Sequence, residues 1–329
     1  MSMPMSQSLS LIRIAGTAYS GSTALDLMLA NADNAFSCGE IDALFRPYRL
    51  HHFSPECGCG DPACSVWKVI REAGETQWLA GVRRLFPQTE WVVDSSKDLN
   101  WIHDQNIVAR RLGVPVHNIL IWKTPADYAY SRFKRGKLKG WLRAYINYHA
   151  RYLSIVNDWI GVPYSQLAAE PASTLASVCG LMGMPYEAGK EQYWNRTHHT
   201  LFGSHSAKLH LYDKDTGSYQ SIAESRVRFK PQVAGGSDNE VTHHKSIYYG
   251  GANLEKLPAS VVRDLETNAT LQDVVKRLES RGYASLVDNK TMGGSGVYDP
   301  LPSSPGIWYA YHRYRRLGRY CACMLRRCI

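Results

Sequence analysis

Two glycines near the start of the chain are spaced as in a loop that binds phosphate. Residues 9–15 form a mostly apolar run, and Gly16 and Gly21 follow within the letters GTAYSGST. Glycines let the backbone approach an anion closely. Side-chain hydroxyl groups and the free N–H groups at the start of a helix can then donate hydrogen bonds to the anion. Ser22 stands where an ATP-hydrolysing loop of this type has lysine. The segment therefore predicts a phosphate site without the lysine that reaches the outer phosphates of ATP.

The elements that must position this loop form an alternating pattern. Three apolar segments rich in Val and Ile, residues 9–15, 91–95 and 116–122, predict strands of one parallel sheet, and helical patterns separate them. Helices are expected at residues 23–32, 137–159 and 171–182, with two short ones within 257–282. The predicted fold class is α/β, a P-loop-like three-layer fold with a central, mostly parallel sheet flanked by helices.

Composition is that of a globular protein with a preference for anionic partners. The chain has 329 residues, a formal net charge of +9 and 44% hydrophobic residues. It contains no run of eighteen apolar residues, and its first residues do not resemble a secretory signal, so we expect a cytoplasmic protein. We expect no nucleic-acid partner.

Three segments follow from the composition along the chain. Residues 1–283 are expected to form the folded domain, 284–306 a linker, and 307–329 a basic aromatic tail with six arginines. The tail could bind an anionic membrane surface, or it could be a packed helix or a disordered end. Residues 197–246 are polar and weakly periodic, which is compatible with loops over a site or with a surface insertion.

A cysteine group in the first third of the chain could bind a metal. The letters CGCGDPAC place Cys57, Cys59 and Cys64 within eight residues. Zinc usually takes four ligands, so a fourth would have to come from Cys38, His51 or His52. A thiol-rich turn is the favoured interpretation, with a zinc site or redox clip as the alternative.

Four motifs together resemble one enzyme family. These are GTAYSGST at residues 16–23, SCGE at 37–40, VDSSK at 93–97 and ILIWKTPADYAYS at 119–131. Their order and spacing are similar to those of sulfotransferases that use 3′-phosphoadenosine 5′-phosphosulfate (PAPS), including bacterial, carbohydrate and protein-tyrosine sulfotransferases. The likeness covers about residues 9–283. It implies PAPS as the sulfuryl donor, adenosine 3′,5′-bisphosphate as the product, and no metal requirement.

The resemblance also implies roles for individual residues. Glu40 matches the position of a catalytic glutamate, whose pKa burial could raise, and Lys97 could contact the transferring group. Runner-up bases are His51, His52, His199 and His205. The residues expected to bind the donor are Gly16, Thr17, Tyr19, Ser20, Gly21, Ser22 and Thr23 on the 5′ side, with Lys123 and Ser131 at the 3′-phosphate.

The chain departs from the family pattern at two positions. Tyr19 stands where the family usually has Arg or Lys, and Lys123 replaces an arginine. Lys97, or else Arg46 or Arg49, could supply the missing charge. Two alternatives stay open: a small-molecule kinase that uses magnesium and ATP, and a catalytically impaired nucleotide-binding or scaffold relative. The acceptor could be a glycan, a lipid, a peptide or a small metabolite.

Overall fold

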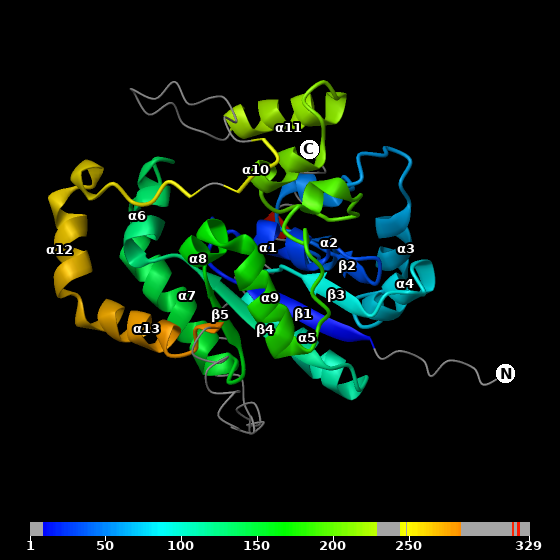
Figure 1. Ribbon diagram of the computed structural model, residues 1–329, viewed down its shortest axis with the longest axis horizontal. Helices are drawn as coiled ribbons and strands as arrows, with labels where there is room; N and C mark the ends of the chain where they lie inside the picture. Colours follow the sequence, from blue (N-terminus) through cyan, green and yellow to red (C-terminus); the bar gives the residue numbers. More distant parts are fainter. Residues whose placement is uncertain (1–8, 229–243, 248, 284–317, 319–320, 323–329) are drawn as a thin grey trace.

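A computed structural model describes residues 9–228, 244–247, 249–283, 318 and 321–322 (Figure 1). Its centre is a parallel sheet of five strands in the order β2-β3-β1-β4-β5. The strands are β1 (Ser10–Ala15), β2 (Ala35–Ser37), β3 (Trp91–Asp94), β4 (Val116–Trp122) and β5 (Ile160–Pro163). The predicted α/β class is confirmed, and β1, β3 and β4 are the three strands expected from the sequence.

The strand order fixes where a ligand site can form. β1 pairs with β3 on one side and with β4 on the other, so the chain crosses over β1 between β3 and β4. In open α/β sheets, ligands bind beyond the carboxyl ends of the strands at such a reversal of strand order. The segments that follow β1, β3 and β4 therefore meet at one edge of the sheet.

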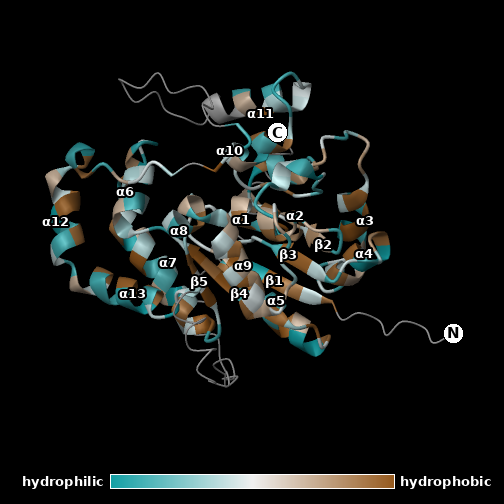
Figure 2. Ribbon diagram, viewed as in Figure 1, coloured by the Kyte–Doolittle hydropathy of each residue, from teal (hydrophilic) through white to brown (hydrophobic). Residues whose placement is uncertain are grey.

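Alternate residues of each strand face opposite layers of helices. Ile12 and Ile14 pack with α1 (Ser22–Leu29) and α9 (Pro171–Met182). Leu120 and Trp122 pack on the other face with α6 (Pro125–Phe133) and α7 (Trp141–Ile155), and Leu11 packs there with residues of α5 (Leu99–Arg111). In Figure 2 the central strands are largely hydrophobic, whereas the helices carry hydrophilic stretches. Helices on both faces explain why β1 and β4 read as nearly continuous apolar runs.

The remaining elements surround this centre. The predicted short helices within 257–282 are confirmed as α12 (Ala259–Thr267) and α13 (Ala269–Glu279). The others are α2 (Asp42–Phe45), η1 (Leu50–Phe53), α3 (Val66–Ala73), α4 (Trp78–Leu85), α8 (Tyr164–Ala169), η2 (Tyr193–Asn195), α10 (His205–Lys208), η3 (Leu209–Leu211), α11 (Gly217–Arg228) and η4 (Leu254–Lys256).

The helix expected over residues 137–159 is shorter than predicted. It begins at Trp141 because Gly140 adopts a left-handed conformation, with φ of 70°, and it ends at Ile155, after which Val156 is extended. The helices at residues 23–32 and 171–182 correspond to α1 and α9.

The predicted linker at 284–306 lies outside the described residues, as does most of the tail at 307–329. Among the helices of the described part, none is long and apolar enough to span a membrane.

Candidate active site

The glycine loop joins β1 to α1 and is packed closely on both sides. A Cβ atom at Gly16 would lie 2.6 Å from the carbonyl oxygen of Ile121, and one at Gly21 would lie 2.3 Å from the ring of Tyr164. Gly21 also has a φ of 97°, in the left-handed region that favours glycine. Both glycines are therefore required by the close approach of β4 and α8 to the loop.

Two hydroxyl groups of this loop are buried without a partner. Thr17 Oγ1 and Ser20 Oγ make no hydrogen bond within the described part of the chain. A buried hydroxyl that lacks a partner costs free energy, about 1–3 kcal/mol. A phosphate oxygen would accept the missing hydrogen bonds, so these residues fit the phosphate group that the sequence predicts.

The next two loop residues have partners in the chain itself. Ser22 Oγ lies 3.3 Å from Lys97 Nζ. Thr23 Oγ1 accepts a hydrogen bond of 2.9 Å from the backbone N–H of Ser204. Thr23, which was expected to bind the donor, thus also fastens α1 to the segment that precedes α10.

Lys97 follows β3 and reaches the loop, as expected from its position after a strand. Asp94 orders this stretch because its carboxylate pairs with Arg13 at 2.9 Å and accepts from the Ser96 N–H at 2.8 Å. The backbone carbonyl of Lys97 accepts from the hydroxyl of Tyr148 on α7, and that same hydroxyl accepts from the N–H of Gly16. α7 therefore holds the glycine loop and Lys97 together.

Lys97 also forms an ion pair with Glu40, so its ammonium group lies between Glu40 and the glycine loop. Burial acts to raise the pKa of Glu40, but Lys97, helped by Arg49 and His52, outweighs it and holds this pKa below its ordinary value. The raised pKa that the sequence suggested is not what the structure favours, since Lys97 stabilises the ionised carboxylate. Glu40 is consequently ionised at neutral pH and able to accept a proton.

A buried carboxylate on α1 fixes the backbone beside Glu40. Asp26 accepts hydrogen bonds from Ser37 Oγ at 2.6 Å, Ser95 Oγ at 2.6 Å and the Gly39 N–H at 3.1 Å. Burial raises the pKa of Asp26 to about 7, although these hydrogen bonds oppose the rise. Asp26 was not among the residues predicted from the sequence, where its signal is a single acidic residue within the otherwise uncharged helix α1.

A second cationic group lies beyond the end of β4. Lys123 Nζ donates to Ser131 Oγ at 3.2 Å, as the resemblance implied for a 3′-phosphate site, and lies 4.7 Å from the centre of the Tyr164 ring. Burial, with the charges of Arg135 and Lys134, lowers the pKa of Lys123 to about 8, although Asp127 opposes the shift. Cations crowded into a partly buried position favour binding of an anion.

Arg135 brings positive charge to Tyr19, one of the two positions at which the sequence departs from the motif that it resembles. Its guanidinium lies 4.1 Å from the centre of the Tyr19 ring and donates to the carbonyl of Ser131 at 2.6 Å. Lys137 Nζ lies 3.4 Å from the Tyr19 hydroxyl. Neither residue was predicted from the sequence, although the letters FKRGK at residues 133–137 form a short basic run that is a signal for a replacement charge.

The alternative cations proposed from the sequence lie differently. Arg46 pairs with both Glu75 and Asp104, so its charge is largely neutralised within the chain. Arg49 acts on Glu40 and, together with burial, lowers the pKa of His51.

The other histidines proposed as bases differ in their surroundings. His52 is buried, and its Nδ1 accepts from the Tyr48 N–H at 3.2 Å. Burial also lowers the pKa of His205, and the positive charge of Lys208 adds to this effect. His199 instead directs Nδ1 toward the sulfur atoms of Cys57 and Cys64.

Comparison of the sequence with protein-family models and with curated proteins gave no match. Two of the solved structures that are similar to this chain are sulfotransferase domains. One, from the curacin biosynthetic pathway, is 18% identical and aligns over 71% of this chain and 96% of its own, with a TM-score of 0.39. The other, from the Synechococcus PCC 7002 olefin synthase, is 16% identical and aligns over 81% and 97%, with a TM-score of 0.41.

Proposed function

We propose that this protein is a sulfotransferase that moves a sulfuryl group from PAPS to a hydroxyl or amine of an acceptor. The observation that carries the proposal is the position of Lys97 Nζ, which contacts both Ser22 of the glycine loop and Glu40. A cation, a carboxylate and a phosphate-binding loop are the groups that such a transfer needs at one place.

Two anion-binding groups around one loop support PAPS in particular. The donor carries a phosphosulfate on its 5′ side and a separate phosphate on its 3′ side. Thr17, Ser20 and Ser22 would bind the first, while Lys123, Ser131 and Arg135 would bind the second. The ring of Tyr164 lies against Gly21 and under the Lys123 ammonium, so both groups border one side chain.

When bound, PAPS would supply the sulfuryl group and the leaving adenosine bisphosphate. Glu40 would take the proton of the acceptor as the acceptor oxygen or nitrogen forms its bond to sulfur. The bond between sulfur and the bridging oxygen breaks, and its electron pair stays on the 5′-phosphate. Lys97 would stabilise the charge that develops there, a contribution of about 3–4 kcal/mol for a preorganised donor.

In this proposal Arg135 supplies the positive charge that an arginine or lysine at position 19 would otherwise provide. A phenol supplies one hydrogen bond and no positive charge. The guanidinium stacked on Tyr19, with Lys137 at its hydroxyl, returns positive charge to that side of the loop. The tyrosine therefore serves as a platform for a cation from the segment after α6.

The first test is calorimetric titration with adenosine 3′,5′-bisphosphate, ADP, and ATP with magnesium. We expect tight binding that requires the 3′-phosphate and weakens by about tenfold to a hundredfold in Lys123→Ala, since a charged hydrogen bond contributes about 1.5–3 kcal/mol. The exposed lysine of α13 offers a matched control, Lys276→Ala, which should bind as the wild type does.

The outcomes separate the proposal from its rivals. Preference for magnesium ATP would favour a kinase and contradict the proposal. Normal bisphosphate binding without transfer of labelled sulfuryl groups to glycan, lipid, peptide and small-metabolite acceptors would favour a nucleotide-binding relative without activity.

A further inference from the structure

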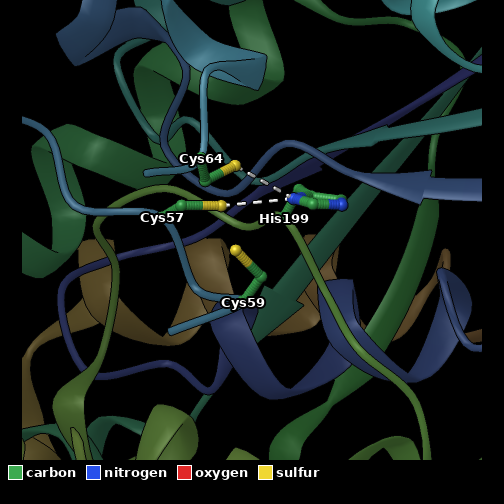
Figure 3. Close-up of side chains that lie close together, drawn as sticks. All are labelled: Cys57, Cys59, Cys64 and His199. Atoms are coloured by element: carbon green, nitrogen blue, oxygen red, sulfur yellow. Dashed lines mark hydrogen bonds between the residues drawn. The ribbon is translucent and has the colours of Figure 1, made fainter. Parts of the chain in front are cut away.

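Four potential metal ligands converge at a place that the proposed reaction does not use (Figure 3). Cys57, Cys59 and Cys64 come from the loop between η1 and α3, and His199 comes from the segment between η2 and α10. One ligand atom from each lies within 4.8 Å of the other three. The fourth member is thus His199 rather than Cys38, His51 or His52, the residues that the sequence suggested.

Two of the distances between ligand atoms are close to those of a tetrahedral site. The Nδ1 atom of His199 lies 3.3 Å from Cys57 Sγ and 3.5 Å from Cys64 Sγ. Ligand atoms of a tetrahedral zinc ion with bonds of about 2.0–2.3 Å are separated by roughly 3.5–3.8 Å. We propose that Cys57, Cys59, Cys64 and His199 bind one zinc ion in a closed structural site.

Backbone hydrogen bonds shape the loop that carries the three cysteines. Gly60 has a φ of 78°, and its N–H donates to the Cys57 carbonyl at 3.2 Å, which closes a turn over residues 57–60 around the second thiol. The N–H of Cys64 donates to the Asp61 carbonyl at 3.2 Å, which closes a second turn just before the third thiol.

The imidazole of His199 is held as well. Its ring centre lies 5.4 Å from that of Phe86 and 6.3 Å from that of Phe36, with the latter pair stacked. These contacts fix the ring while Nδ1 points to the thiols, as Figure 3 shows.

Three cysteines and one histidine favour a zinc site over an iron–sulfur cluster or a disulfide. Three thiolates and one imidazole form a common structural zinc set, whereas iron–sulfur clusters most often take four cysteines. A disulfide would use two of the three sulfur atoms and would leave the third, with His199, without a function.

The zinc site would also stabilise the backbone around Glu40 in the proposed active site. The N–H of Gly58 donates to the Thr200 carbonyl at 2.8 Å, and the N–H of Glu40 donates to the Leu201 carbonyl at 3.0 Å. One continuous segment next to His199 thus contacts both the cysteine loop and the backbone of Glu40. Because four protein ligands leave no open position, the ion would be structural and would take no part in catalysis.

The test is metal analysis of the full chain, purified under reducing conditions without chelator. We expect about one zinc per chain, and replacement with cobalt should give the thiolate-to-metal charge-transfer band of a tetrahedral site. Cys59→Ser and His199→Ala should lose most of the metal, whereas His199→Cys, which offers a fourth thiolate, should retain it. Cys179→Ala changes a buried cysteine outside the cluster and should keep the full zinc content.

Three results would overturn the inference. One is wild-type protein that contains no zinc and does not bind cobalt. Another is mass spectrometry that finds a disulfide between two of the three cysteines in freshly purified protein. The third is unchanged zinc content in folded His199→Ala. None of these measurements depends on sulfuryl transfer, so the zinc inference and the proposed activity can fail separately.

Discussion

The lowered pKa of Lys123 predicts that the proposed binding of adenosine 3′,5′-bisphosphate depends on pH. Burial and the neighbouring charges of Arg135 and Lys134 lower this pKa to about 8 in the free protein. A phosphate bound at Lys123 would stabilise the ammonium form and raise the pKa again. Binding of adenosine 3′,5′-bisphosphate should therefore take up a proton near pH 8, and affinity should fall as pH rises.

The magnitude follows from the fraction of Lys123 that is protonated. With a pKa of about 8, roughly nine-tenths of the side chains are charged at pH 7 and roughly one-tenth at pH 9. If only the charged form binds, affinity falls about tenfold over this range, which corresponds to about 1.4 kcal/mol. The phosphate contributes little because its second pKa is about 6 and it stays dianionic throughout. Arg135 stays charged as well, because an arginine side chain does not lose its proton in this pH range.

Calorimetry in two buffers of different ionisation enthalpy measures both quantities. At pH 8 we expect uptake of about half a proton per nucleotide bound. The matched variant is Lys123→Arg, which keeps the charge but does not titrate below about pH 12, so its affinity should be nearly constant from pH 7 to 9. If the wild type binds tightly with no proton uptake and shows the same flat profile as Lys123→Arg, the placement of the phosphate at Lys123 is refuted.

Three further predictions concern the carboxylates and cations of the site. Glu40→Gln should bind adenosine 3′,5′-bisphosphate normally yet lose about 10²–10⁴ in turnover of labelled PAPS, and an equal loss of binding would contradict its role as a base. Arg135→Gln should weaken bisphosphate binding about tenfold to a hundredfold in the same titration, while unchanged affinity would show that the stacked guanidinium serves Tyr19 alone. The raised pKa of Asp26 means that the folded state keeps a proton that the unfolded state releases, so stability should fall by at most about 4 kcal/mol as pH rises from about 4 to about 7. Asp26→Asn, compared with wild type in urea unfolding at several pH values, should flatten this slope, and an unchanged slope would point to other groups.

The strands that could be predicted are those whose burial leaves a long signal. β1, β3 and β4 are covered by helices on both faces, and their sequences are correspondingly apolar. β2 has three residues and β5 four, and β5 contains Gly161 and Pro163, which normally argue against a strand. Parallel pairing with longer neighbours, rather than local preference, places these two segments at the edges of the sheet.

Residues of the candidate site could likewise be predicted only where a local sequence signal places them. Lys97 and Lys123 could be located from sequence because each follows a predicted strand, and parallel strands bring their carboxyl ends together. Arg135 reaches Tyr19 through a side-chain stacking contact, which no spacing rule encodes. His199 joins Cys57 across 142 residues of chain, so the local letters CGCGDPAC indicated an incomplete ligand set but could not identify the missing member.

The central position of β1 bears on how the chain reaches its native state. Arg13 and its partner Asp94 are 81 residues apart in sequence, and the pairing with β4 spans a longer stretch still. During synthesis β1 therefore precedes both of its neighbours, and the edge of β1 that pairs with β4 has no partner until β4 has left the ribosome. Truncated versions that end before Val116 would retain an open edge beside β1, a surface prone to aggregation. Experiments that dissect this protein should accordingly keep the chain intact through β5, even when only the glycine loop is of interest.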